Sequence, residues 1–132
     1  MEFWTEKTAL TEPSVPQLRD ALHSEEVSEG WIGQIEKSDK DYLHAMAFMK
    51  PTGEAGFYLE RRGPEPDQWY MGITPGRPKH ILPMPWWQFW AKDIEIYLFE
   101  HDEMVEAFCQ VLSGVSQPDL AEWEEIPPSY ED

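Results

Sequence analysis

The residues of this chain best suited to metal binding or nucleophilic chemistry are its four histidines and its one cysteine. No two of His23, His44, His80 and His101 are three or four residues apart, the spacing that places two side chains on one helix face. Structural zinc sites cluster His and Cys ligands, and Cys109 alone on a helix does not supply such a cluster. The acidic start of that helix would raise the thiol pKa rather than lower it. We therefore predict no metal site and a structural role for Cys109.

Other catalytic patterns are also missing from the sequence. The segment Gly53–Gly56 lacks the lysine, the hydroxyl and the following helix of a phosphate-binding loop. No nucleophile elbow is present. With 26 acidic residues, some carboxylates will always lie close together, so proximity alone does not indicate a glycosidase pair. The sequence predicts no catalytic residues, no cofactor and no enzymatic activity.

Charge is distributed very unevenly along the chain. The formal net charge is −16, and no lysine or arginine follows Lys92. Phosphate binding requires a basic surface, so direct binding of nucleic acid is not expected. An acidic surface accelerates association with a basic protein, and this is the interpretation we favour. A plainer alternative is an acidic, soluble surface without a dedicated partner. The carboxylates after Lys92 are Asp93, Glu95, Glu100, Asp102, Glu103, Glu106, Asp119, Glu122, Glu124, Glu125, Glu131 and Asp132.

Aromatic residues are abundant, with seven Trp, six Phe and five Tyr, which argues against disorder despite the charge. In Trp86–Trp90 an extended chain would place large rings on both faces. One set could pack in the core, and the other could anchor an interface, because Trp and Tyr dominate binding hot spots. Trp69 and Tyr70 allow the same two interpretations. The predicted partner-binding residues are Glu100, Asp102, Glu103, Glu106, Glu122, Glu124, Trp69, Tyr70 and Trp87.

Two segments have the apolar spacing of amphipathic helices. Ser14 and Gln17 have the capping-box spacing, which predicts a helix over Val15–His23. A second helix is predicted over Asp102–Ser113, ended by Gly114. Its apolar stripe consists of Met104, Val105, Phe108, Val111 and Leu112.

Short apolar runs separated by Gly and Pro turns predict an antiparallel meander. The expected strands are Glu2–Thr8, Trp31–Glu36, Tyr42–Met49, Gly56–Arg61, Gln68–Ile73, Lys79–Leu82, Asp93–Phe99 and Leu120–Ile126. Asp93–Phe99 has the clearest alternation. The predicted fold class is α+β, an antiparallel sheet meander with two amphipathic helices packed on one face. At this length a single domain over residues 1–132 is expected, with 127–132 a loose acidic tail.

Localisation is predicted to be cytoplasmic. The segment Met1–Lys7 has neither the basic nor the apolar region of a signal peptide. No apolar run approaches the roughly 20 residues that cross a bilayer, so no membrane association is expected. A single cysteine also suits a reducing compartment.

The C-terminal part of the chain resembles a known family. The segment Met104–Phe108 is followed by Gly114, Pro118 and Trp123, in a pattern of helix, glycine, proline and terminal Trp strand. This pattern resembles the deaminase-associated immunity family of bacterial polymorphic toxin systems. The resemblance implies a small cytosolic inhibitor that binds one toxin domain and occludes its active site.

Two functions follow as expectations. The first is an immunity protein that binds a cognate toxin one-to-one, the toxin acting on nucleic acid or nucleotide through a basic cleft. The alternative is a secretion chaperone, which would hold an extended segment of an exported effector in a groove or along a sheet edge. The two differ in whether the partner is a folded catalytic domain or an unfolded segment.

Overall fold

The computed structural model describes residues 1–65, 68–74, 77, 80–82 and 94–126. The aromatic segment Trp86–Trp90, Asp93 and the predicted tail 127–132 lie outside the described residues. The predictions made for them, including partner binding by Trp87, therefore stay predictions.

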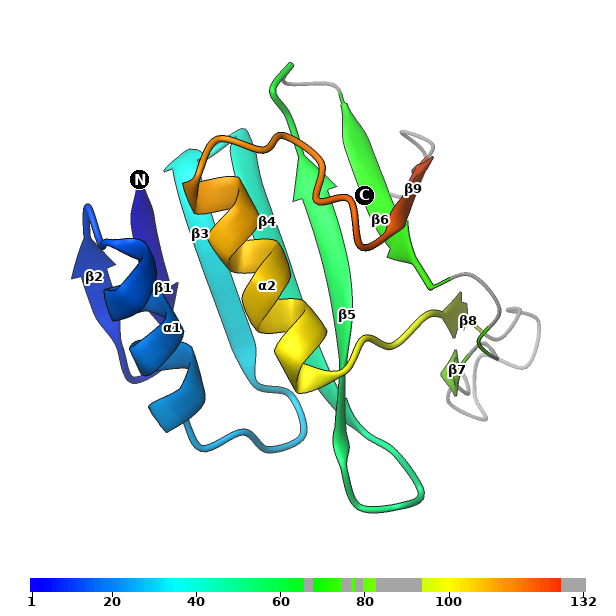
Figure 1. Ribbon diagram of the computed structural model, residues 1–132. Helices are drawn as coiled ribbons and strands as arrows, with labels where there is room; N and C mark the ends of the chain where they lie inside the picture. Colours follow the sequence, from blue (N-terminus) through cyan, green and yellow to red (C-terminus); the bar gives the residue numbers. More distant parts are fainter. Residues whose placement is uncertain (66–67, 75–76, 78–79, 83–93, 127–132) are drawn as a thin grey trace.

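A seven-stranded antiparallel sheet forms the body of the fold, and both helices lie on one side of it (Figure 1). Its strands follow the spatial order β2-β1-β3-β4-β5-β6-β9. The predicted α+β class and the meander are confirmed, because β3 to β6 are neighbours in both sequence and space. The strands are β1 (Glu2–Thr5), β2 (Ala9–Thr11), β3 (Ile32–Ser38), β4 (Asp41–Met49), β5 (Ala55–Arg62), β6 (Trp69–Ile73) and β9 (Glu122–Glu125). A separate two-stranded sheet pairs β7 (His80–Leu82) with β8 (Ile94–Ile96).

The first helix, α1 (Val15–Ser24), begins with the predicted capping box. The backbone N–H of Gln17 donates to the Ser14 hydroxyl at 3.3 Å, and the Ser14 N–H donates to the Gln17 side chain at 2.8 Å. These two bonds satisfy donors that a helix start leaves unpaired. Leu18 and Leu22 are fully buried, so the helix packs against the core through its apolar side.

The second helix, α2 (His101–Leu112), lies across the middle of the sheet (Figure 1). Gly114 follows it with a φ of +99°, a conformation that side-chain-bearing residues rarely adopt. Phe108 is fully buried and meets the edge of Phe3 on β1, with the ring centroids 6.0 Å apart. The buried residues of α2 are Met104, Val105, Ala107, Phe108, Cys109 and Val111.

One glycine of the sheet allows a large ring to approach the backbone closely. A Cβ on Gly33 would come within 2.5 Å of the Trp31 ring. Trp31, directly before β3, and Gly33 and Ile35 within it are all buried, as strand alternation over this segment predicts. The Trp31 ring also meets the edge of Phe57 at 5.7 Å, which joins it to the centre of the core.

A buried cation joins the sheet to the chain that follows α2. The Arg61 guanidinium is almost fully buried and pairs with Asp41 at 2.7 Å. It also donates to the backbone carbonyls of Tyr42 at 3.0 Å and of Ser116 at 2.6 Å. The fork-shaped guanidinium can bind several acceptors at once, which offsets the cost of burying its charge.

Two predicted strands differ from the structure. The segment Glu2–Thr8 does not continue as one strand, because the Thr5 hydroxyl accepts the N–H groups of Lys7 and Thr8 and forms a turn. The chain then returns as β2, which the sequence analysis missed.

The predicted strand Asp93–Phe99 is shortened to Ile94–Ile96. Leu98 and Phe99 are both buried, so the alternation stops before the end of the apolar run. The backbone of Phe99 exchanges two hydrogen bonds with Phe57, of 2.9 and 2.8 Å, and leads directly into α2.

Cys109 is buried and not disulfide-bonded. Burial raises the pKa of its thiol; Glu106 adds to this shift, whereas Arg19 opposes it. The predicted direction is confirmed, although desolvation rather than the acidic helix start is the main cause. Within the described residues, neither helix is long and apolar enough to cross a bilayer.

We expect Phe108→Ala to lower the free energy of unfolding by about 3–5 kcal/mol, because it leaves a cavity between α2 and β1. Urea unfolding followed by fluorescence measures this loss. Val115→Ala, at an exposed position just beyond the same helix, is the control and should change stability by less than about 0.5 kcal/mol. A Phe108→Ala protein as stable as the control would show that α2 does not pack through this ring.

Candidate functional site

The seven-stranded sheet has one face that neither described helix covers (Figure 1). Strand alternation sends the fully buried residues of β4, such as Leu43, Ala45 and Ala47, toward the helices. The intervening residues of the strands, which are mostly half-buried, lie on the opposite side, which we call the open face. It consists of Trp4, Ile32, Gln34, Glu36, Tyr42, His44, Met46, Phe48, Tyr58, Glu60, Arg62, Trp69, Met71, Ile73, Glu122 and Glu124.

Hydrogen bonds hold the aromatic rings of this face in place. The Tyr58 hydroxyl donates to the Glu60 carboxylate at 2.8 Å, and the Trp69 indole donates to its other oxygen at 3.3 Å. The Arg62 guanidinium lies over the Trp69 ring, 4.5 Å from the centroid. Rings fixed before binding lose less conformational entropy when a partner arrives.

Burial also keeps the Tyr58 hydroxyl protonated. Desolvation raises the pKa of Tyr58, and the charge of Glu60 and its hydrogen bond raise it further. The hydroxyl is therefore a fixed donor to Glu60, and not a base or a nucleophile at neutral pH.

A second polar chain crosses β1, β3 and β4. The Trp4 indole donates to the Glu36 carboxylate at 2.9 Å, and the Gln34 amide donates to the same group at 3.4 Å. The Gln34 amide oxygen lies 2.9 Å from Nδ1 of His44, so this nitrogen carries a proton in the hydrogen bond. Burial lowers the pKa of His44, whereas the charge of Glu60 opposes the shift.

The structure divides the predicted partner-binding residues between the two sides of the sheet. Trp69 on β6 and Glu122 and Glu124 on β9 share the open face, because Glu124 is opposite Met71 in the register. Tyr70 is opposite Arg61, so it belongs to the side that the helices cover. The four acidic residues at the start of α2 also lie on the helix side (Figure 1).

Three of these four carboxylates have cationic neighbours. Glu100 pairs with Lys50 at 2.9 Å, and Glu106 pairs with Arg19 of α1 at 3.3 Å. Glu103 receives two hydrogen bonds from the Arg77 guanidinium, which lower the pKa of its carboxyl. Asp102 differs, with a side chain 93% exposed. The negative charge of the carboxylates on the helix side is therefore partly neutralised. The sequence did not suggest these ion pairs, because their partners are far apart along the chain.

Tyr58, Glu60, His44 and Gln34 were not among the predicted site residues. They lie on β3, β4 and β5, and the alternation within each strand, a signal that is present in the sequence, sets which side chains share a face. Their mutual contacts depend on the register between strands, which the sequence analysis did not assign.

No protein-family model, curated protein or solved structure matches this chain. The fold and the open face together define a class, an acidic α+β protein with a one-sided sheet. The open face presents aromatic rings and carboxylates that are joined by hydrogen bonds.

We expect stability to fall on acidification from about pH 7 to about pH 5, partly because of His44. The folded state lowers the pKa of His44, so the unfolded chain binds the proton more readily. The contribution is therefore fully present above the unfolded pKa and is lost as the pH falls toward the folded pKa. The free energy of unfolding is measured at both pH values, with a chelator present to remove metal ions. Its decrease on acidification should be smaller in His44→Gln than in the parent.

Thr52→Gln introduces the same side chain at an exposed position without removing a titratable group and is the control, which should keep the parental pH dependence. If His44→Gln also keeps the full dependence, His44 is not buried as a neutral imidazole.

Proposed function

We propose that this chain is a stoichiometric protein inhibitor of the immunity type, which binds a folded toxin domain through the open face. The observation that carries the proposal is the set of half-buried aromatic rings that Glu36 and Glu60 fix on the sheet face that neither described helix covers. Such a surface gains affinity from desolvating Trp and Tyr without first having to order them.

Charge supports a basic partner. The chain carries a formal charge of −16, and the open face contributes Glu36, Glu60, Glu122 and Glu124 against Arg62. A toxin that acts on nucleic acid or nucleotide has a basic cleft, which this surface complements. The mechanism is occlusion: the carboxylates accelerate encounter, and the rings slow dissociation.

The edges of the sheet favour an inhibitor over a secretion chaperone. A chaperone that adds an extended segment to a sheet needs a long free edge strand. The two strands at the edges of the sheet, β2 and β9, have three and four residues. Three of the four residues of β9 are glutamates, which discourage strand addition.

Co-expression tests the biological role. Cells that produce the toxin domain encoded beside this gene should survive only when this protein is also produced, and the two should purify as a one-to-one complex. Survival without this protein, or capture of an unfolded effector segment instead, would contradict the proposal.

Two pairs of charge reversals locate the docking surface. Glu122→Lys with Glu124→Lys should slow association with the toxin several-fold at low salt, because both side chains lie on the open face. Asp102→Lys with Glu106→Lys makes the same change in net charge on the helix side and should have a smaller effect. Stopped-flow association rates over a range of salt concentrations measure both.

Trp69→Ala tests the anchor directly. Removal of this tryptophan ring should weaken the complex by about 2 kcal/mol or more, roughly thirtyfold in Kd, mainly through faster dissociation. Circular dichroism checks that the variant is folded. A larger effect from the helix-side pair than from Trp69→Ala would move the docking surface to α2.

A further inference from the structure

Two histidines far apart in the sequence meet where α1 ends and α2 begins. His23 lies in the last turn of α1, and His101 is the first residue of α2. Their ring centroids are 5.3 Å apart, and the rings are tilted by 49°. Sequence spacing predicts no such pair, because the contact arises from the packing of one helix beside the other.

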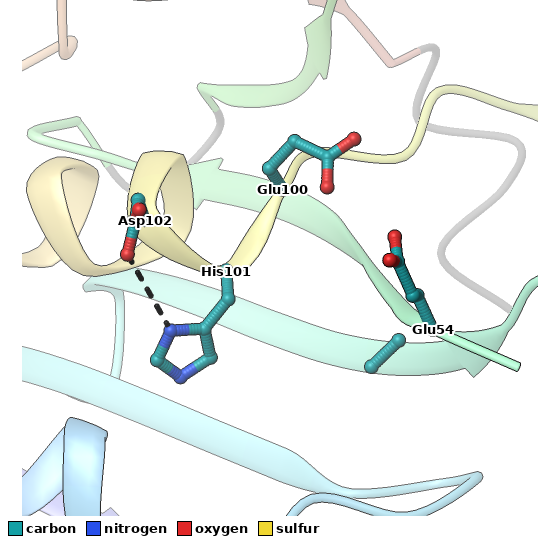
Figure 2. Close-up of a pocket in the computed structure, with 5 residues that line it drawn as sticks. Glu54, Glu100, His101 and Asp102 are labelled. Atoms are coloured by element: carbon teal, nitrogen blue, oxygen red, sulfur yellow. Dashed lines mark ion pairs between the residues drawn. The ribbon is translucent and has the colours of Figure 1, made fainter.

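Asp102 completes a set of three possible metal ligands. The imidazole nitrogens and the carboxylate oxygen of His23, His101 and Asp102 lie within 4.8 Å of one another. Figure 2 shows the Asp102 carboxylate directed toward the His101 ring, with Oδ1 4.0 Å from Nδ1. Ligands around a tetrahedral zinc ion lie about 3.3 Å apart, so the side chains must approach by about 1.5 Å at most.

The surroundings allow this approach and favour a cation. The Asp102 side chain is 93% exposed and His23 is exposed, so both can change rotamer without moving the core. The His101 ring also packs against the buried Phe57 ring in an edge-to-face arrangement, with the centroids 5.7 Å apart. Glu54 and Glu100 line the depression beside it and add negative potential, although Lys50 pairs with Glu100 (Figure 2).

We propose that His23, His101 and Asp102 bind one divalent transition-metal ion, with water completing the coordination. Two imidazoles and one carboxylate suit zinc and its neighbours in the first transition row, whereas calcium and magnesium prefer oxygen ligands throughout. The bound ion links the end of α1 to the start of α2. This site is independent of the open face and of the proposed inhibitor function.

Titration of tag-free protein with zinc chloride, followed by isothermal calorimetry, tests the site. The parent should bind one zinc ion per chain, and His23→Gln and Asp102→Asn should each weaken binding at least tenfold. Cobalt(II) added in place of zinc should give the visible absorption of a four-coordinate site in the parent and lose it in His23→Gln. Both positions are exposed, so the variants should fold like the parent.

Asp39→Asn is the matched control, because it removes one exposed carboxylate from the turn between β3 and β4. It should leave the zinc affinity unchanged. Zinc should also raise the melting temperature of the parent and of Asp39→Asn but not of His23→Gln. The proposal is overturned if the parent shows no saturable one-to-one binding, or if His23→Gln binds zinc as tightly as the parent.

Discussion

The packing of α2 against the sheet is the interaction on which the rest of the structure depends. One face of this helix buries six side chains, and Phe108 reaches across to Phe3 on β1. The same helix contacts α1, so it is the element through which both helices and the central strands form one core. Desolvation of these side chains is the main stabilising contribution in a chain whose charges repel one another.

Because both helices pack on one face of the sheet, the side chains of the open face are stabilised in a different way. The open face must tolerate water while its aromatic rings stay ordered, and hydrogen bonds to Glu36 and Glu60 achieve this. On the helix side the carboxylates of α2 and its N-cap form ion pairs instead, with Arg19, Lys50 and Arg77. The negative charge of the chain is therefore distributed unevenly. Cationic side chains neutralise more of the carboxylates around α2 than along β9.

Local signals in the sequence predicted the local structure well. Ser14 and Gln17 predicted where α1 starts, Gly114 predicted where α2 ends, and the apolar stripe identified Phe108 as a core residue. The alternation within Trp31–Glu36 placed Trp31, Gly33 and Ile35 on one side, and all three are buried.

Contacts between distant segments were not predictable in the same way. The Phe99–Phe57 bridge shortened the strand with the clearest alternation, because a tertiary contact replaced continued pairing with β7. Tyr70 and Trp69 are neighbours on one strand and therefore lie on opposite faces of the sheet, and partner binding by both stays a prediction. The meeting of His23 with His101 likewise depends on how two helices pack, which spacing along the chain does not specify.

Alkylation of the buried Cys109 thiol can be used to measure local opening of the fold. The sulfur is shielded by the core and its pKa is raised, so in the native state an alkylating reagent meets a protonated, inaccessible group. Alkylation of the thiol requires α2 to separate from the sheet. When reclosing is faster than alkylation, the rate of alkylation depends on the free energy of this opening. Because no other cysteine is present in the chain, the modified fraction reports on this one movement without background.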